Sequence, residues 1–230
     1  MQNRRWILFG AAVVLLGAAI LTVGCTTSSS KPKLRLFNGT LDEPSLDLLV
    51  DSASTATGVA YGNASSYVSV TAGSRNLQAE VTGTSTIIAS ATESVTSGDY
   101  YTFMTLNCST CGTSPVFFTD DNTLPPSGDF NLRIINASPG LGAQDVYVNQ
   151  SSGPTGTPYA SSLGLGSASG YDSLALGTWN VYFTSPGGTF VNANGTVTVS
   201  STGSVRTLVV FNAPAGSGSP FSTTVLSDLN

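Results

Sequence analysis

The fold is decided by a stretch that occurs twice in the chain, first as Leu34-Arg-Leu-Phe-Asn-Gly-Thr40 and again as Leu132-Arg-Ile-Ile-Asn-Ala-Ser138. The two copies align without a gap, and the register holds as far as Asp47-Leu-Leu-Val-Asp51 and Asp145-Val-Tyr-Val-Asn149. Self-similarity at a fixed spacing is the sign of a repeated structural unit. The chain of 230 residues is therefore expected to contain two copies of one unit.

The repeat extends well beyond that stretch. Gly62-Asn-Ala-Ser-Ser-Tyr67 corresponds to Gly166-Ser-Ala-Ser-Gly-Tyr171, and Gly98-Asp-Tyr-Tyr-Thr102 corresponds to Gly203-Ser-Val-Arg-Thr207. The blocks keep one order, and the second copy has six more residues between the first two blocks. This agreement favours two domains of one fold that together cover nearly all of the chain after its N-terminal run.

Both copies have the alternation typical of β-strands. In Arg75-Asn-Leu-Gln-Ala-Glu-Val81 apolar and polar side chains alternate, as in a strand with one buried face. Tyr100–Leu106 and Val205–Phe211 are apolar or threonine-rich on both faces, as in a central strand. We predict an all-β protein with two tandem immunoglobulin-like β-sandwich domains after an N-terminal lipoprotein signal helix.

The N-terminus resembles a bacterial lipoprotein signal. Arg4 and Arg5 precede an uncharged apolar run, which ends in Thr22-Val-Gly-Cys25 with a small residue directly before a cysteine. This order predicts cleavage before Cys25 and attachment of lipid, including palmitate, at its thiol. Two alternatives remain open. One is an uncleaved membrane anchor, because the run is near the shortest length that spans a bilayer, and the other is ordinary secretion.

These features give the expected organisation of the chain. A signal peptide at 1–24 and a Ser/Thr-rich tether at 25–32 precede a first sandwich at 33–120, a linker at 121–129 and a second sandwich at 130–230. Pro125 and Pro126 favour a fairly stiff linker between two autonomous domains. We expect a protein held by lipid in the bacterial envelope, facing the periplasm or the surface. Thr26 stands where an inner-membrane retention signal has aspartate, which favours the outer membrane.

Composition limits the partners. Charged residues make up only 9% of the chain, and its formal net charge is −5. Binding of nucleic acid needs clustered Lys and Arg, so we expect no nucleic-acid partner. An acidic body is also repelled by an anionic lipid surface, which leaves membrane attachment to the lipid on Cys25. The remaining candidate partners are an envelope protein or a glycan.

Cys108 and Cys111 are the other two cysteines and form a C-x-x-C. In an exported protein, an even number of remaining cysteines favours a small structural disulfide. Free thiols and a redox pair are the alternatives, but a redox site would want a helix N-terminus to lower the thiol pKa. Here a strand-like run precedes the pair and no helical pattern follows. A zinc site would need two further ligands, and the chain has no histidine.

Catalytic motifs are missing from the sequence. Without histidine, Ser-His-Asp and Cys-His catalytic devices are excluded. The sequence contains neither a G-x-x-x-x-G-K-[ST] phosphate loop nor a D-x-D-x-D-G calcium loop. Asp42-Glu43 and Asp120-Asp121 fall in expected turns or linkers, where carboxylates are usually solvated rather than arranged for glycoside hydrolysis. We expect no catalytic residue, no cofactor and no metal.

The second copy resembles the opening of the bacterial domain of unknown function 4397. It has Leu132-Arg-Ile-Ile-Asn-Ala-Ser-Pro139 and then Asp145-Val-Tyr-Val148, where that family has R-h-x-N-A-S-P followed by V-D-V-Y-V-D-G. The first copy departs further, with Gly39-Thr-Leu41 in place of Ala-Ser-Pro and Leu48-Leu49 in place of Val-Tyr. The resemblance implies exported immunoglobulin-like sandwiches. It implies no catalytic residues, because the family has no assigned activity.

Two pairs of charged residues repeat with equal spacing. Arg35 and Asp47 in the first copy correspond to Arg133 and Asp145 in the second. The pattern predicts a structural ion pair between neighbouring strands of each domain. The alternative is an anion site built on each arginine.

Tyr147, Tyr159 and Tyr182 are the candidates for a binding surface. Tyr147 corresponds to Leu49 of the first copy, and Tyr182 corresponds to Gln78. Tyr159 lies in the segment that is inserted in the second copy. We expect these tyrosines to point outward and to stack on a sugar or on a partner surface. The alternative is that they pack against cross-strand neighbours.

The sequence therefore favours a lipid-anchored structural or interaction module of the cell envelope without catalytic activity. The alternative is a lipoprotein that binds carbohydrate or another small ligand, and an enzyme is the least favoured class. A concave pocket lined by several polar groups would favour the ligand-binding alternative.

Overall fold

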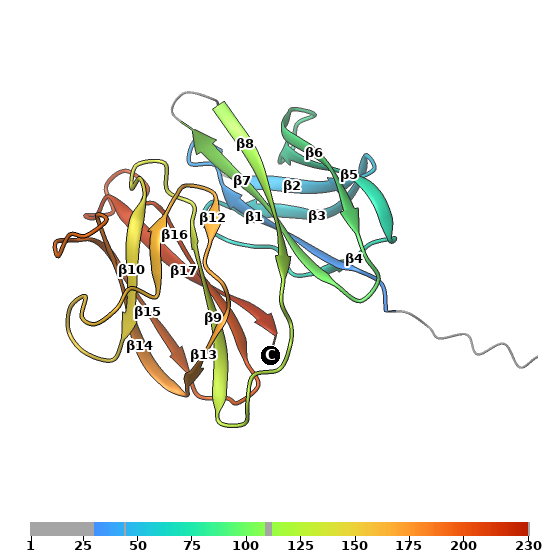
Figure 1. Cartoon of the computed structure of the whole chain (residues 1–230). Coiled ribbons are helices and arrows are strands. Elements are labelled where there is room, and N and C mark those ends of the chain that lie inside the picture. Colours follow the sequence, from blue (N-terminus) through green and yellow to red (C-terminus); the bar gives the residue numbers. More distant parts are fainter. Residues whose placement is uncertain (1–29, 44, 109–111, 230) are drawn as a thin grey trace, which may run out of the picture.

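The computed structural model describes residues 30–43, 45–108 and 112–229 (Figure 1). Within these ranges the chain forms seventeen β-strands and no helix. The first eight strands are β1 (Lys33–Gly39), β2 (Ser45–Val50), β3 (Ala53–Ala60), β4 (Val68–Ser69), β5 (Gly73–Val81), β6 (Ile87–Val95), β7 (Tyr100–Cys108) and β8 (Gly112–Asp120). The others are β9 (Asp129–Asn136), β10 (Gln144–Asn149), β11 (Ala160–Leu163), β12 (Ser167–Ala168), β13 (Asp172–Ala175), β14 (Gly177–Thr184), β15 (Val191–Val199), β16 (Val205–Asn212) and β17 (Phe221–Leu229).

Each repeat forms two sheets of corresponding topology. In the first domain the sheets have the strand orders β3-β2-β5-β6 and β4-β1-β7-β8. In the second domain they have the orders β11-β10-β14-β15 and β12-β9-β16-β17, with β13 also pairing with β9. The first strand of each repeat runs parallel to a late strand, β1 to β7 and β9 to β16, whereas the other pairs are antiparallel. The two repeats are thus two copies of one sandwich.

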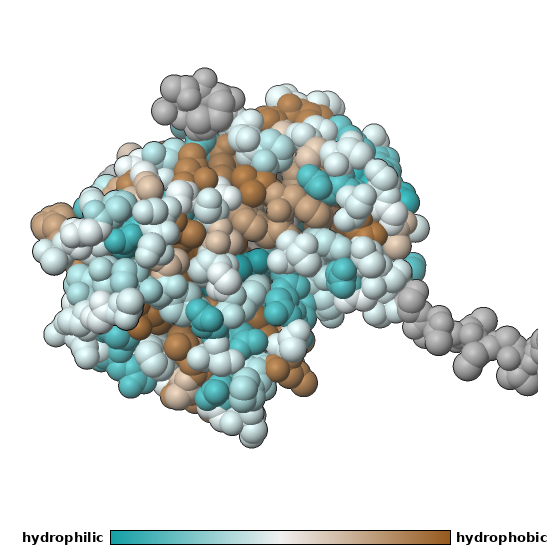
Figure 2. All heavy atoms as spheres, in the orientation of Figure 1, coloured by the Kyte–Doolittle hydropathy of each residue, from teal (hydrophilic) through white to brown (hydrophobic). Residues whose placement is uncertain are grey.

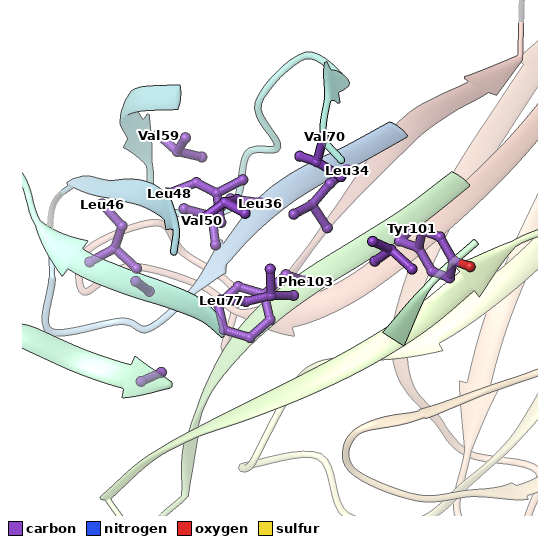
Figure 3. Close-up of a cluster of buried hydrophobic side chains, with 13 residues drawn as sticks. Leu34, Leu36, Leu46, Leu48, Val50, Val59, Val70, Leu77, Tyr101 and Phe103 are labelled. Carbon is purple, nitrogen blue, oxygen red and sulfur yellow. The ribbon is translucent and has the colours of Figure 1, made fainter. Parts of the chain in front are cut away.

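The alternation of apolar residues builds the core of each sandwich. In the first domain Leu34 and Leu36 of β1 meet Leu46 and Leu48 of β2 and Phe103 of β7, and these side chains are fully buried (Figure 3). Side chains of successive strand residues point to opposite faces, so every second residue of these strands enters the core. The second domain has an equivalent core around Phe130, Phe183 and Val181.

The two sandwiches stack to give four layers of sheet. The β4-β1-β7-β8 sheet of the first domain and the β12-β9-β16-β17 sheet of the second enclose a third buried cluster, which contains side chains of both domains. Strands β1, β7, β9 and β16 are therefore buried on both faces. Figure 1 shows the two domains side by side, with the chain entering the first domain on the side away from β10, β14 and β15.

The predicted all-β fold with two tandem sandwiches is confirmed. In the described ranges no helix is long and apolar enough to cross a membrane. The expected signal helix, its cleavage site and Cys25 lie outside the described residues, and so does most of the expected tether.

Candidate functional site

The asparagine of the repeated stretch fixes the loop between the first two strands of each domain. Asn38 is fully buried, and its side-chain nitrogen donates to the carbonyls of Glu43 (3.2 Å) and Val59 (3.1 Å). Its Oδ1 accepts from the backbone N–H of Thr40 (3.0 Å). Asn136 makes the equivalent three bonds in the second domain. The motif asparagine is therefore a structural residue, because it satisfies backbone groups that would otherwise be buried without partners.

The arginine of the same stretch crosses from one domain to the other. Arg35 donates from Nε to Thr102 of its own domain (2.9 Å), and from Nη1 to the carbonyl of Ser227 (3.1 Å) in the second domain. Its Nη2 lies 2.5 Å from Oδ1 of Asp228. The side chains of Arg35 and Asp228 are only 3% and 0% exposed, so this is a buried ion pair between domains.

Arg133 makes the reciprocal contacts. It donates to Thr207 of its own domain (3.0 Å) and to the carbonyl of Thr119 in the first domain (3.1 Å). Its Nη2 lies 2.5 Å from Oδ1 of Asp120. Each domain thus gives one arginine to its neighbour and receives one, and a pseudo-twofold axis relates the two halves of the interface. All four charges are buried and paired, as buried charges must be.

Two tyrosines complete this network. Tyr67 and Tyr171 place their rings over Arg35 and Arg133, with 4.6 Å from the guanidinium carbon to the ring centroid in both cases. Their hydroxyls donate to the two aspartates of the network at 2.7 Å. Burial raises the pKa of both tyrosines far above its ordinary value, so they remain hydrogen-bond donors.

The predicted ion pairs of Arg35 with Asp47 and of Arg133 with Asp145 are wrong. Strands β1 and β2 follow one another in the chain but lie in different sheets, and β9 and β10 do the same. The arginines face the other domain, while Asp47 accepts from the backbone N–H of Gly58 (2.7 Å) on the outer sheet. Asp145 accepts from two backbone N–H groups, and these bonds hold the pKa of its carboxyl below the ordinary value.

An apolar seam continues the interface along the strands beside the buried network. It joins Phe37, Met104 and Leu106 of the first domain to Ile135, Ala137, Val209, Phe211 and Leu226 of the second. The rings of Phe37 and Phe211 meet edge to face with 6.2 Å between centroids. Figure 2 shows apolar side chains along the junction of the domains. Val116 and Phe118 of β8 are partly buried and pack against the seam. The interface is therefore well packed as well as charged.

A polar cleft of ≈ 590 Å³ opens at one end of the seam. The loops after β1 and β9 and the ends of β7, β8 and β16 form its walls, with the lining residues Gly39, Thr40, Leu41, Asp42, Glu43, Tyr61, Asn107, Gly112, Thr113, Pro139, Gly140 and Asn212. Tyr61 donates its hydroxyl to the carbonyl of Asn212 (2.6 Å), and burial together with the charge of Asp42 raises its pKa to about 12. None of these lining residues is basic, so the cleft disfavours anions.

Two of the three predicted surface tyrosines lie together. Tyr147 of β10 and Tyr182 of β14 are directly opposite each other in the antiparallel register. Their neighbours Val146, Val148 and Val181 belong to the core or pack against it, so both tyrosines are on the outer face of the sheet. Both side chains are partly exposed, and the Tyr182 hydroxyl donates to the carbonyl of Ser151 (3.2 Å). The proposed role of this pair in binding stays a prediction.

The third tyrosine does not share that surface. Tyr159 packs against the core of the second domain, its hydroxyl donates to the carbonyl of Leu132, and it accepts from the backbone N–H of Asp172 (3.2 Å). The expectation that it points outward is wrong. Its hydroxyl joins β9 to β13 at the register partners Leu132 and Asp172, and burial raises the pKa of that hydroxyl.

Sequence reasoning missed an exposed aromatic residue. Phe190 lies in the loop between β14 and β15 and is 80% exposed. It follows Ser185-Pro-Gly-Gly-Thr189, which is a turn signal, and a large apolar side chain after such a signal is the feature that could have identified it. The cleft and the interface were also missed, because they form between the repeats.

The cysteine predictions remain open. Cys25 and Cys111 lie outside the described residues, and the side chain of Cys108 is not described either. Lipid attachment and the disulfide therefore stay predictions. Among the described residues there is no group of three or more His, Cys, Asp and Glu side chains that could hold a metal ion.

Comparisons with known proteins give distant structural likenesses and one family. A family 26 carbohydrate-binding module from Eubacterium rectale, in complex with maltoheptaose, is similar with 14% identity and a TM-score of 0.28 over 86% of this chain and 98% of that chain. A streptococcal virulence factor that binds alpha-glucan is similar with 12% identity and a TM-score of 0.25 over 73% of this chain and 88% of that chain. No curated protein matches. The model of the domain of unknown function DUF4397 matches residues 32–147 and 130–230, so the chain belongs to the DUF4397 family, with two copies of its domain.

Proposed function

We propose that the chain is a lipid-anchored interaction module of the bacterial cell envelope, which acts by binding and not by catalysis. The observation that carries the proposal is the buried interface between the two sandwiches, in which each domain pairs one arginine with an aspartate of the other. Two domains that only shared a linker would move independently. Here two ion pairs with side chains at most 3% exposed and an apolar seam hold them together.

A rigid pair of domains is suited to presenting a binding surface to a partner rather than to catalysing a reaction. Folded pairs of domains with large apolar interfaces keep one relative orientation, whereas lids and hinges are taken from weakly packed segments. The chain enters the first domain at Lys33, and the outer β11-β10-β14-β15 sheet lies on the far side of the second domain (Figure 1). A tether attached at Cys25 would therefore hold the body by one side and present the other to a partner.

Lipid attachment is tested by labelling cells with radioactive palmitate. We expect the wild-type protein to incorporate label and to fractionate with membranes. The variant Cys25→Ser should carry no label and either remain an unprocessed precursor or be released. A wild-type protein that takes up no label would overturn the lipid anchor, whatever its binding properties.

Binding to the envelope is tested separately with purified residues 26–230. We expect this soluble protein to sediment with isolated cell envelopes and to leave their glycans and proteins chemically intact. Failure to sediment with envelopes under all salt conditions would contradict an interaction module. Release of sugars or peptides by the pure protein would contradict a non-catalytic one.

A further inference from the structure

The outer face of the second domain carries an ordered set of aromatic and amide side chains. Tyr147, Tyr182 and Asn194 form one row across β10, β14 and β15, because they are direct partners in the strand register. The adjacent row consists of Asn149, Asn180 and Thr196. Asn194 and Thr196 are exposed, and the other four residues are partly exposed. The inward residues between them pack in the core, so the two rows share the outer face.

The two rows contain no charged residue, although the chain as a whole is acidic with a net charge of −5. The nearest acidic residue along β10 is Asp145, which is only 7% exposed. Its carboxylate is already occupied by the backbone N–H groups of Ser162 and Gly187, both at 2.8 Å. The two rows therefore offer amides, hydroxyls and ring faces to a ligand, without a net charge.

The first domain shows that packing does not require these tyrosines. The equivalent outer face has Leu49 opposite Gln78, at the positions of Tyr147 and Tyr182. Its next row places Asp47 opposite Glu80, where the second domain has Asp145 opposite Thr184, so the first face has one more acidic residue in that row. Both domains have the same sheet order and comparable cores. The aromatic pair is thus a property of one copy and not of the fold.

The insertion of the second copy lies beside the same face. Asn149 holds the loop after β10 by accepting from the backbone N–H of Ser151 (3.0 Å) and donating to the carbonyl of Gly153 (3.1 Å). The carbonyl of Ser151 in turn accepts from Asn180 and Tyr182, both at 3.2 Å. The loop thereby forms a wall at the edge of the two rows and fixes the orientation of side chains in them.

A further aromatic residue lies in a loop at the end of the same sheet. Phe190 is 80% exposed on the hairpin that joins β14 to β15, and these strands carry Tyr182 and Asn194. The corresponding hairpin of the first domain, Thr82 to Thr86, contains no aromatic residue. The ring of Phe190 is therefore accessible to a ligand at this end of the sheet.

We propose that the two rows, with Phe190 beside them, bind a neutral glycan chain. The C–H face of a hexose ring is apolar and packs on tyrosine and phenylalanine rings, while its hydroxyls both donate and accept, as asparagine side chains do. Tyr and Asn are also residues that supply contact area and adaptable hydrogen bonds at low entropic cost in recognition surfaces. The absence of a basic residue from the two rows disfavours phosphorylated or carboxylated polymers. This ligand class rests on the function proposed above and gives it a partner.

The test uses purified residues 26–230 in titration calorimetry with cellohexaose, maltoheptaose and mannohexaose, and with polygalacturonate as an anionic polymer. We expect the wild type to bind at least one neutral hexose oligomer and not polygalacturonate. The double variant Tyr147→Leu/Tyr182→Gln installs the residues that the first domain already tolerates. It should bind at least about tenfold more weakly, as expected for the loss of aromatic anchors, with an unchanged melting temperature.

The matched control is Leu49→Ala/Gln78→Ala, which alters the equivalent positions of the first domain and should leave glycan binding unchanged. Equal binding by wild type and the tyrosine variant would overturn the proposal, and so would binding of polygalacturonate alone or of no glycan at millimolar concentration. Sedimentation with envelopes that persists in the tyrosine variant would overturn this face and leave the envelope function standing. If the wild-type protein takes up no palmitate in cells but purified residues 26–230 bind glycan, the lipid anchor is overturned and the binding face stands.

Discussion

The two buried arginines determine how the domains are joined. Each of them has its own carboxylate, a backbone carbonyl and a threonine hydroxyl as partners, and each is covered by a tyrosine ring. Replacing a whole buried pair by apolar residues is often neutral, whereas removing one partner leaves an uncompensated charge out of water. The interface should therefore tolerate the exchange of complete pairs and not the loss of one member.

Loss of Asp228 should be strongly destabilising. The variant Asp228→Ala leaves Arg35 buried with only the more distant Asp120, whose Oδ2 lies 3.8 Å from Nη2 of Arg35. We expect the free energy of unfolding to fall by about 3–5 kcal/mol, measured by denaturation with urea. The control is Arg75→Ala, which removes an ion pair with Asp51 whose side chains are 25% and 47% exposed. Arg75→Ala should lower the free energy of unfolding by at most about 1 kcal/mol. Equal losses in the two variants would contradict a stabilising role of the buried ion pair between Arg35 and Asp228.

The motif residues could be identified from the sequence, but their partners could not. Arg35 and Asn38 recur at the same places in both copies, which marks them as important. Their roles depend on contacts with residues far away in the chain, such as Asp228 for Arg35 and Val59 for Asn38. A spacing argument looks for partners on adjacent strands, and it therefore paired Arg35 with Asp47. The same limit applies to Tyr159, because its hydroxyl contacts Leu132 and Asp172, and no local sequence signal brings these residues together.

The inner strands are largely apolar on both faces, and the sequence alone allows two explanations of this pattern. Tyr100–Leu106 is apolar or threonine-rich on both faces, which correctly predicts a central strand. Its inward face meets the core of its own sandwich, as Phe103 shows, but its other face with Met104 meets the second domain. The pattern cannot distinguish a second domain from a covering layer of the same one. The strands and the repeat were thus predictable, whereas the division of the strands between the sheets and the four-layer stack were not.

The turn after β3 is another place where the domains touch. Gly62 has a φ of +73°, and a Cβ at this position would lie 2.6 Å from the ring of Phe211 in the other domain. Gly166 is the corresponding residue of the second copy and has a φ of +70°, with a Cβ that would come within 3.3 Å of Val116. Both glycines therefore allow a close approach of the domains as well as a left-handed turn.

Substitution of Gly62 separates these two requirements. The control variant Gly58→Ala has a similar φ of +67° with open space around the Cβ, so it should cost about 1–2 kcal/mol of backbone strain only. Gly62→Ala should cost about 1–3 kcal/mol more because of the clash with Phe211. In a double-mutant cycle, Phe211→Leu should recover part of this extra loss. Additive effects of Gly62→Ala and Phe211→Leu would show that the ring does not limit the turn.

In the whole molecule, the two domains of one chain are related like the two subunits of a homodimer. The interface uses the same positions of both repeats, since Arg35, Thr102 and Asp120 of the first correspond to Arg133, Thr207 and Asp228 of the second. Such a surface is self-complementary, as in isologous dimers. The expectation of two autonomous domains separated by a stiff linker therefore needs a direct test, because each domain alone would expose two charges and an apolar seam.

A fragment of residues 129–230 should show this self-complementarity. Freed from the first domain, it exposes Arg133 and Asp228 together with apolar residues such as Phe211. Two copies can satisfy both charges at once, because Arg133 of each takes the role of Arg35 and meets Asp228 of the other. We expect a homodimer in sedimentation velocity at micromolar concentration, with a β-type spectrum and an unfolding midpoint that rises with protein concentration. The same fragment with Asp228→Lys should remain monomeric, because it places like charges opposite each other across the interface. A wild-type fragment that folds and stays monomeric at micromolar concentration would show that the buried interface depends on features that only the first domain supplies.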